Sequence, residues 1–480
     1  MTESRTMTWP TGPIAPVDTS RPHFVGIGGS GMSALAKIFA ARGSRVSGSD
    51  AEASPTLAML AAEGYHVHAW HAAANVDGAT CVVVSTAIDR SNPEVLAAKA
   101  RGIQVIHRAQ ALAMLMSGHQ AVAVTGSHGK SSTTAMLATV LRELGMNPSH
   151  AVGADVTGPG SGACHGSGRT FIAEADESDR SFLALRPDVA LILNVDDDHP
   201  ENYADLAAHV SAHTAFGRCV TPSGTLIANA DDPATRRVIA RLQRGSPHPR
   251  ILTYGAAPDA GVRIVNTQTC GWASLTTVAM REGAHLTIAM TIPGRHLAHN
   301  AVGALAVARE LGADPRAVAD ALAGYRGIAR RFTRIGEVNR VTVVDSYACH
   351  PTEIAADLET ARSLTEGRVI VVFQPSGVAR TWARGTRAGH ALAAADVVLL
   401  LDIYGRTGSQ GPGATSKIVG DAVKANGGTV LAEPERSIVP LRITELARPG
   451  DIVLTMGTGD VASLGRGIVD HDHSPVPEHA

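Results

Sequence analysis

The chain has 480 residues, which is enough for about three domains of ordinary size. Charged residues make up 18% of the chain and the formal net charge is -2, so composition excludes the strongly basic surface typical of proteins that bind nucleic acid or anionic membranes. The five cysteines show no C-x-x-C spacing and no apolar run reaches the length of a membrane span, so we expect a cytoplasmic protein without a disulfide framework.

The first elements have the order of a dinucleotide-binding fold. A short apolar strand at 23–25 leads into the pattern G-x-G-x-x-G at 26–31, followed by a helical stretch at 32–42 and a second strand at 44–49 that ends at Asp50. Glycines in this turn allow a pyrophosphate close to the backbone, and the acid can reach a ribose hydroxyl. Further strands at 81–85 and 104–106 alternate with Ala-rich helical stretches, which predicts a parallel sheet. An NAD-binding domain is the alternative interpretation.

A second glycine-rich segment is a phosphate-binding loop. Residues 125–134 read T-G-S-H-G-K-S-S-T-T, after the apolar run 121–124 and before a helical stretch at 135–145. Glycines turn backbone N–H groups toward phosphate oxygens, Lys130 supplies a cation, and the Ser131 hydroxyl can ligate Mg²⁺. ATP is therefore the expected ligand.

Acidic residues follow two later strands of this second domain. The run 174–179 (E-A-D-E-S-D) comes after the strand at 170–173, and 196–199 (D-D-D-H) comes after the strand at 189–195. Ligands at strand ends in a wound sheet face the same crevice, so we expect Glu174 and Ser131 to form a Mg²⁺ site with His199 as a further ligand. Strands at 225–228 and 251–254, an antiparallel insertion through 262–291, and helices at 298–311 and 315–323 complete the domain.

The last part of the chain predicts another wound α/β sheet. Strands at 341–345, 368–373, 397–401 and 452–456 are separated by helical patterns. Three of these strands end in polar turns, at 345–353, at 373–375 followed by Arg380, and at 456–460. Three such turns on the carboxyl edge of one sheet favour a binding face.

Taken together, these motifs resemble those of the Mur ligases over residues 22 to 465. The motifs are 26–33, 126–134, 174–179, Asn194 with 198–199, 293–296 with Asn300, 330–332, 345–353, 373–375 with 380–381, and 456–461. The resemblance implies an α/β fold of three domains: a Rossmann-like domain at 22–117 that binds a UDP-sugar, a central P-loop ATPase-type domain at 118–334, and a Rossmann-like C-terminal domain at 335–468 that binds an amino acid. We expect residues 1–21 to be a disordered extension and 469–480 a flexible tail.

The resemblance is strongest to the alanine-adding branch of this family. It implies that ATP phosphorylates the lactyl carboxylate of UDP-N-acetylmuramate and that the amine of L-alanine attacks the acyl phosphate, a step of peptidoglycan synthesis. The implied catalytic residues are Lys130, Glu174 and His199, with Mg²⁺ on Ser131, Glu174 and His199. The remaining implied sites are ATP on Gly126, Ser127, Gly129, Lys130, Ser131, Ser132, Asn300, Arg331 and Asp345, UDP-sugar on Gly28, Gly31, Met32, Ser33 and Asp50, and the amino acid on His350 and Arg380.

Departures from the family pattern gather in the C-terminal domain. Ser376 and Cys349 each stand where the family usually has a histidine, and the loop from Gly405 to Gly411 is altered. The alternatives are therefore a paralogue that joins another amine or carboxylate, or a non-catalytic protein that binds UDP-sugar or ATP. An NAD oxidoreductase is disfavoured by the second nucleotide loop. We expect a monomer or weak dimer that binds neither nucleic acid nor membrane.

Overall fold

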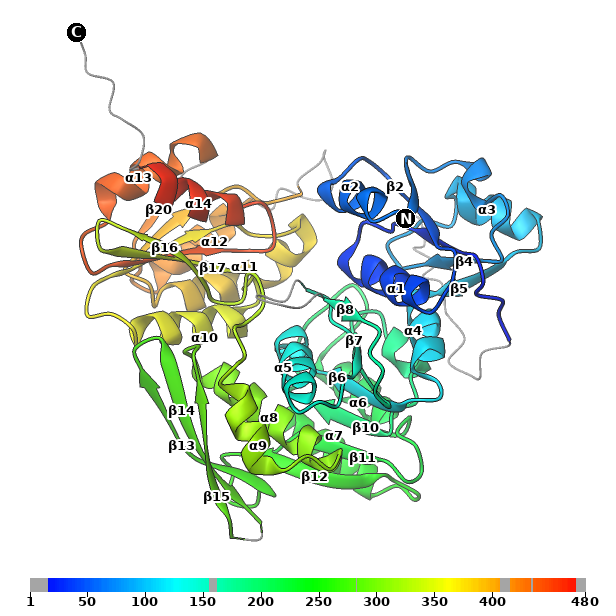
Figure 1. Ribbon diagram of the computed structural model, residues 1–480. Coiled ribbons are helices and arrows are strands. Elements are labelled where there is room, and N and C mark those ends of the chain that lie inside the picture. The colour runs from blue at the N-terminus through cyan, green and yellow to red at the C-terminus, as the bar shows by residue number, and fades with distance from the viewer. Residues whose placement is uncertain (1–15, 155–161, 282, 406–414, 433–434, 472–480) are drawn as a thin grey trace. The chain divides into compact units, whose positions relative to one another are not determined.

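The computed structural model describes residues 16–154, 162–281, 283–405, 415–432 and 435–471. Contacts divide the chain into two compact units. Unit 1 comprises residues up to 266 with 277–288 and 299–325, and unit 2 comprises 267–276, 289–298 and the residues from Arg326 onward. Three sheets, each flanked by helices, are distributed over these units (Figure 1). This is the three-domain α/β architecture expected from the sequence.

The first sheet is parallel throughout and has the strand order β3-β2-β1-β4-β5. Its strands are β1 (Pro22–Val25), β2 (Ser47–Asp50), β3 (His66–Ala69), β4 (Cys81–Val84) and β5 (Gln104–His107). Its helices are α1 (Ser30–Ala41), α2 (Pro55–Ala62), α3 (Pro93–Ala100) and α4 (Arg108–Met116), with the 3₁₀ turn η1 (Ala73–Val76). The order reverses between β1 and β4, which is where a wound sheet opens a ligand crevice at its carboxyl edge.

The second sheet has the order β15-β14-β13-β12-β11-β10-β6-β9-β7-β8. Its strands are β6 (Gln120–Thr125), β7 (Ser149–Ala151), β8 (Ala163–Cys164), β9 (Thr170–Glu174), β10 (Val189–Ile192), β11 (Thr225–Asn229), β12 (Arg250–Gly255), β13 (Val262–Cys270), β14 (Ala273–Met280) and β15 (His285–Met290). The helices are α5 (Lys130–Glu143), α6 (Leu206–Gly217), α7 (Pro233–Gln243), α8 (Arg295–Glu310) and α9 (Pro315–Leu322), with the 3₁₀ turn η2 (Ser181–Ala184).

Burial in the second sheet explains its two kinds of strand. The four residues of β10 are all buried, as in a strand covered by helices on both faces, whereas β15 alternates exposed and buried residues, as in a strand with one solvated face. Strands β13 to β15 extend from the edge of this sheet (Figure 1). They form the insertion that the alternating sequence pattern predicted.

The third sheet lies in unit 2 and has the order β16-β17-β21-β18-β19-β20, with only the β16–β17 pair antiparallel. Its strands are β16 (Thr333–Val338), β17 (Val341–Ser346), β18 (Val369–Phe373), β19 (Val397–Leu400), β20 (Val430–Ala432) and β21 (Ile452–Met456). The helices are α10 (Pro351–Arg362), α11 (Val378–Leu392), α12 (Lys417–Ala425), α13 (Val439–Leu446) and α14 (Ala462–His471), with the 3₁₀ turn η3 (Arg436–Ile438).

Three predicted boundaries differ from the structure. The C-terminal sheet begins before residue 335, because β16 starts at Thr333 and pairs with β17, and the last continuous part of unit 2 starts at Arg326. Residues 16–21 were assigned to a disordered extension, yet the Ser20 carbonyl accepts a hydrogen bond from the Arg45 N–H. Helix α14 continues to His471, into the predicted tail. Residues 1–15 and 472–480, and most of the loop that follows Gly405, lie outside the described residues.

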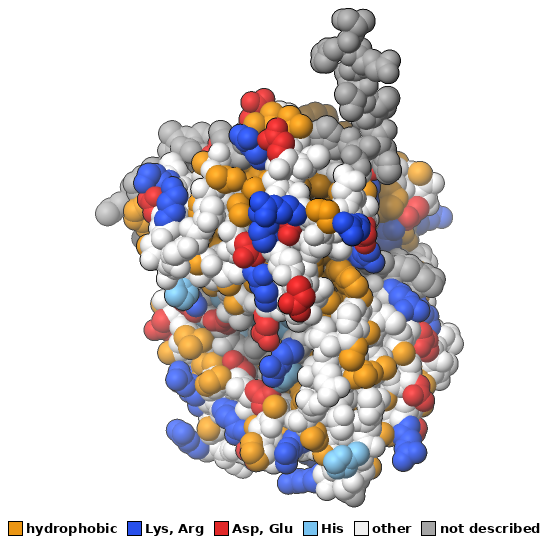
Figure 2. All heavy atoms as spheres, turned by 90° about the vertical axis from the view of Figure 1, so that its left-hand side faces the viewer, with side chains coloured by type: hydrophobic (Ala, Val, Ile, Leu, Met, Phe, Trp, Pro, Cys, Tyr) orange, Lys and Arg blue, Asp and Glu red, His pale blue; other side chains and the backbone are white. Residues whose placement is uncertain are grey.

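Basic and acidic side chains are interspersed on the face of the molecule shown in Figure 2. This agrees with the nearly balanced numbers of Lys plus Arg, 42, and Asp plus Glu, 44. Within the described residues, every helix is too short or too polar to serve as a membrane span.

Candidate nucleotide site

The predicted phosphate loop connects β6 to α5. Its last residue, Gly129, is the N-cap of α5 and has φ of +86°, a left-handed conformation that favours glycine. A Cβ at this position would lie 2.8 Å from the side-chain nitrogen of Asn300, so the loop requires glycine and Asn300 of α8 lies against it. No side chain caps the N-terminus of α5, which leaves the N–H groups of its first turn for an anion.

Lys130 is the cation at the centre of this loop. Its Nζ donates to the Gly126 carbonyl at 2.8 Å and to Glu177 Oε1 at 3.0 Å, and the Glu177 side chain is fully buried. Burial alone would lower the pKa of Lys130, but Glu177, Asp176 and Glu174 outweigh this effect and raise it above its ordinary value. The lysine therefore remains charged across the physiological range.

The acidic run that follows β9 divides into separate contacts. Glu174 accepts a hydrogen bond from the Ser131 hydroxyl at 2.9 Å, whereas Glu177 pairs with Lys130. Asp176 Oδ2 accepts from Arg108 at 3.0 Å; burial opposes the charge of Asp176, but Arg108, Lys130 and Ser178 lower its pKa to about 2. Glu174, Glu177 and Asp176 thus each bind a different partner, and the run is not simply a solvent-exposed loop.

Ser131 and Glu174 together provide oxygen ligands of the kind that Mg²⁺ prefers. The Glu174 Oε2 atom lies 2.9 Å from the Ser131 hydroxyl and 3.0 Å from the Gly153 N–H. Ser131 lies in the first turn of α5, beside the uncapped helix N-terminus. The structure therefore brings together the two predicted ligands beside the phosphate loop, and their chemistry fits a divalent cation.

His199, the third predicted ligand, lies beside a different acid. It has φ of +52°, and its Nε2 is 3.7 Å from Glu177 Oε1 and 3.7 Å from Asp198 Oδ2, while Nδ1 is 3.3 Å from Glu201. Glu177 therefore connects His199 to Lys130. The sequence motif contained Glu177, but sequence analysis assigned it no role, because nothing in the run distinguishes which carboxylate points toward the lysine.

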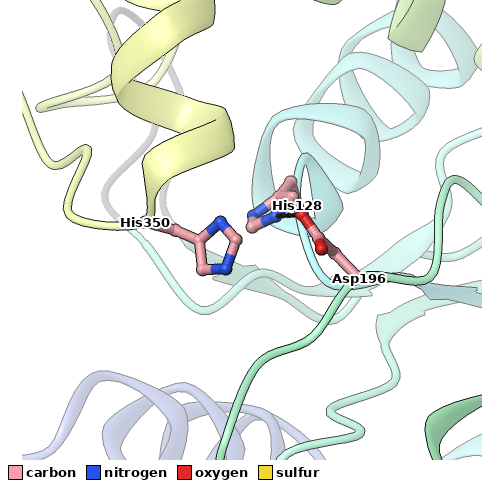
Figure 3. A group of neighbouring side chains, drawn as sticks. All are labelled: His128, Asp196 and His350. Atoms are coloured by element: carbon pink, nitrogen blue, oxygen red, sulfur yellow. Dashed lines mark hydrogen bonds and ion pairs between the residues drawn. The ribbon is translucent and has the colours of Figure 1, made fainter. Parts of the chain in front are cut away.

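Residues after β10 hold the loop in shape. The His128 N–H donates to Asn194 Oδ1 at 2.8 Å, and Asn194 Nδ2 donates back to the His128 carbonyl at 3.0 Å. The Asp196 N–H donates to the Ser127 hydroxyl at 2.8 Å, and the carboxylate of Asp196 lies 3.2 Å from His128 Nε2 (Figure 3). Asn194, His128 and Asp196 all stand within motifs of the sequence, but the motifs alone indicate no role for them. Their separation of 66 and 68 residues hides these pairs in the sequence.

The N-terminal glycine turn has its own acid. The Gly28 N–H donates to Asp50 Oδ2 at 2.8 Å, and a Cβ on Gly28 would lie 2.5 Å from that oxygen. A Cβ on Gly31 would lie 3.0 Å from Arg108, the residue that binds Asp176. Met32 packs in the hydrophobic core, and Ser33 donates to the Ser30 carbonyl. Of the predicted UDP-sugar residues, Gly28 and Asp50 are therefore directly linked.

In unit 2, the arginine at the end of the sheet is Arg330 rather than Arg331. Arg330 donates to Asp345 Oδ2 at 3.3 Å, to the Gly457 carbonyl at 2.6 Å and to the Thr458 carbonyl at 3.2 Å. Burial raises the pKa of Asp345, although Thr455 and Arg330 oppose that effect. Arg331 instead donates to Glu353 at 3.3 Å. The pair predicted to bind ATP, Arg331 and Asp345, thus belongs to two different contacts.

The predicted amino-acid residues of unit 2 lie at the starts of two helices. His350 is the N-cap of α10, with Nδ1 accepting from the Thr352 N–H at 3.3 Å, and it is labelled in Figure 3. Arg380 lies in the first turn of α11. Gln374, from the turn after β18, accepts a hydrogen bond from the Val461 N–H at 3.2 Å. These turns follow β17, β18 and β21, which are neighbours in the sheet, as the sequence predicted.

Comparison with known families matches most of the chain. Residues 21–120 match the family described as "Mur ligase family, catalytic domain", 124–308 match "Mur ligase middle domain", and 330–459 match "Mur ligase, glutamate ligase domain". Among curated proteins, the chain is similar to the UDP-N-acetylmuramate–L-alanine ligase of Streptomyces griseus, with 47% identity over 96% of this chain and 98% of that protein. The enzyme of the same name from Mycolicibacterium vanbaalenii is 41% identical over 95% and 96%.

Solved structures agree with these matches. The crystal structure of UDP-N-acetylmuramate–alanine ligase from Thermotoga maritima superposes with a TM-score of 0.79 at 27% identity, covering 95% of this chain and all of that one. A murein peptide ligase from Psychrobacter arcticus has the same fold, with a TM-score of 0.71 at 23% identity over 95% and 99% of the two chains.

Proposed function

The chain belongs to the Mur ligase family, and on this premise we propose that it catalyses ATP-dependent amide formation between the lactyl carboxylate of UDP-N-acetylmuramate and L-alanine. The product would be a precursor of peptidoglycan, made in the cytoplasm by a monomer or weak dimer. The main support is the 47% identity to a protein of that name over nearly the full length of both chains. The phosphate loop with Lys130, Ser131 and Glu174 supplies the chemistry that such a ligase requires.

Phosphoryl transfer is mainly a problem of position and charge, and the loop addresses both. The uncapped N-terminus of α5 presents N–H groups, and Lys130 remains charged because three carboxylates surround it. Ser131 and Glu174 would hold Mg²⁺, which neutralises phosphate charge when it is bound. Glu177 positions the lysine, and His199 lies 3.7 Å from the same carboxylate.

The substrate carboxylate would attack the γ-phosphorus of ATP, and ADP would leave. In the second step the alanine amine attacks the carbonyl carbon of the acyl phosphate, a tetrahedral intermediate forms, and inorganic phosphate leaves as the amide is made. For the second step we propose His350 and Arg380 as amino-acid-binding residues, since a guanidinium can bind a carboxylate with two parallel hydrogen bonds. Asn300, Arg331 and Asp345 are proposed to bind ATP.

A phosphate-release assay tests the proposal directly. The chain would be incubated with ATP, Mg²⁺, UDP-N-acetylmuramate and, in separate reactions, L-alanine, glycine, L-serine and simple amines, with omission of each component as the control. We expect release that depends on all four components and is fastest with L-alanine. If phosphate is released only with another amine, that amine and not L-alanine is the substrate. The departures from the family pattern at Cys349 and Ser376 would then explain the changed amine specificity. Nucleotide binding without any release would contradict a catalytic role.

A further inference from the structure

Trp70 has a backbone conformation that its side chain does not favour. It follows β3 with φ of +83°, in the left-handed region where bulky residues are rarely found. The residue is 67% exposed, so burial does not offset the strain. A strained backbone conformation persists only where surrounding contacts impose it, and such conformations are common at ligand-binding sites.

Hydrogen bonds on both sides of Trp70 impose this conformation. The Trp70 N–H donates to the Asp50 carbonyl at 2.7 Å, and the Trp70 carbonyl accepts from Asn75 Nδ2 at 3.1 Å. Asn75 Nδ2 also donates to the carboxylate of Glu94 at 2.6 Å, and the Glu94 side chain is fully buried. The peptide groups on either side of Trp70 are therefore fixed by Asp50 of β2 and by Asn75 of η1, and Asn75 is itself held by Glu94 of α3.

The next residue, His71, is fixed by the same carboxylate. Its Nδ1 lies 2.9 Å from the Ser49 hydroxyl and 3.2 Å from Glu94 Oε2. Burial would raise the pKa of Glu94, but the His23 imidazole 3.7 Å away and hydrogen bonds from Ser49 and Asn75 lower it to about 2. An ionised, fully buried carboxylate thus anchors the turn that presents Trp70.

Trp70 stands at the carboxyl edge of the first sheet. In the β2–β3 register Asp50 is opposite Ala69, so Trp70 is the first residue beyond that pair. Asp50 in turn accepts the Gly28 N–H of the glycine turn. In sheets of this kind a nucleotide lies along this edge, with its pyrophosphate at the glycines and its ribose near the acid.

We propose that Trp70 is a substrate-binding residue whose exposed indole stacks on the pyrimidine base of the uridine diphosphate part of the substrate. The inference rests on the proposed function for the identity of the nucleotide. It explains why the backbone of an exposed tryptophan is fixed in a strained conformation beside Asp50, since a ring presented from a fixed backbone has only its side-chain torsions left to order on stacking. Base–aromatic stacking changes affinity by about tenfold or more.

The test compares Trp70→Gly and Trp70→Phe with the native chain by calorimetry, using UDP as the ligand without ATP or alanine. Glycine tolerates the positive φ, so we expect Trp70→Gly to melt at the native temperature or above it while UDP binds about tenfold more weakly. Trp70→Phe keeps an aromatic face and should retain most of the affinity. Met59→Ala is the matched control, because Met59 of α2 is a large apolar side chain of the same domain that is 46% exposed.

Two further measurements separate stacking from a structural role. Inorganic pyrophosphate lacks a base, so its inhibition constant as a competitor of UDP should be the same for the native chain and Trp70→Gly. UDP should quench the tryptophan fluorescence of the native chain and not that of Trp70→Phe. Native affinity of Trp70→Gly for UDP, or an equal loss of UDP and pyrophosphate binding, would overturn the inference and leave the proposed ligase activity standing. Absence of UDP binding by the native chain would overturn both.

Discussion

The carboxyl ends of the second and third sheets both carry a buried ion pair, but the two pairs are built differently. At the second sheet, Lys130 meets Glu177 and also two backbone carbonyls of its own loop, at Gly126 and Ser127. At the third sheet, Arg330 meets Asp345 and also two backbone carbonyls, at Gly457 and Thr458. The carbonyls that hold Lys130 lie four and three residues away, so this cation stays within the phosphate loop, whereas those that hold Arg330 lie 127 and 128 residues away and connect its segment to the turn after β21. Charge at a strand end is therefore insufficient to identify a ligand site.

The largest expected effect is at Lys130. Lys130→Ala should lower phosphate release by about 10³-fold or more, because the loop loses its cation. The same variant leaves the buried Glu177 carboxylate without its lysine partner, so the free energy of unfolding should fall by about 3–5 kcal/mol. Phosphate release and urea denaturation measure the two effects.

The double variant Lys130→Met with Glu177→Gln is the matched control for that experiment. It removes both charges, so most of the lost stability should return while phosphate release stays absent. An active Lys130→Ala enzyme would show that the phosphate loop is assigned to the wrong segment.

The next effect separates two neighbouring hydroxyls. Ser131 donates to Glu174, whereas Ser132 is the following buried residue of α5. Ser131→Ala should raise the Mg²⁺ concentration needed for half-maximal phosphate release by about 10-fold or more, and Ser132→Ala should leave it nearly unchanged. A Mg²⁺ titration at saturating ATP measures this difference. Equal Mg²⁺ requirements in the two variants would remove Ser131 from the metal site.

Arg330 and Arg331 sharpen the comparison between the two sheets. Arg330→Met should lower the free energy of unfolding by about 2–3 kcal/mol, because Asp345 and two carbonyls lose a charged donor. Arg331 pairs with Glu353 at a partly exposed site, so Arg331→Met should cost less than about 1 kcal/mol. If Arg331 binds ATP as proposed, its variant should instead raise the KM for ATP. Urea denaturation measures the loss of stability in each variant, and initial rates measure the KM for ATP. A raised KM in Arg330→Met but not in Arg331→Met would assign ATP binding to Arg330.

The last effects are small for each unit of pH and have opposite signs in the two units. In unit 2, burial raises the pKa of Asp357 from its ordinary 3.8 to about 7, although Ser346 opposes the shift. The folded chain then holds a proton that the unfolded chain releases, so this contribution to stability is complete below about pH 4 and is lost as pH rises through 7. The loss is on the order of 1 kcal/mol per pH unit, and Asp357→Asn should abolish it. Unfolding midpoints of the native chain and the variant between pH 4 and 8 should therefore converge on acidification.

In unit 1, burial lowers the pKa of His213 from 6.5 to about 4. Between these two pKa values, His213 is protonated in the unfolded chain and neutral in the folded chain. The stability present above pH 6.5 is therefore lost as pH falls toward 4. His213→Gln should flatten that acidic limb without changing the alkaline one. If the unfolding midpoint of His213→Gln depends on pH as that of the native chain does, His213 is not the cause of the acidic loss of stability.

Much of the fold was predictable because the signals are local. The apolar runs that became β6, β10 and β18 are short and continuous, and each is followed by a turn or a helical pattern. The short strands β3 and β16 were missed, since their residues are partly exposed and polar and they pair at the edges of their sheets. Their existence depends on a neighbouring strand and not on their own composition.

The sequence by itself determined that a phosphate loop with Lys130 and Ser131 stands between a strand and a helix, because glycine, cation and hydroxyl act within a few bonds of one another. Only the tertiary structure decided which carboxylate reaches each of them: Glu177 contacts the lysine, Glu174 the serine and Asp176 an arginine of the first domain. It likewise decided that Arg330, and not Arg331, meets Asp345, and that Trp70 stands exposed beside Asp50. Partners separated by tens of residues meet only if their side chains point toward each other once the sheet has formed. The spacing of residues in the sequence does not determine that direction.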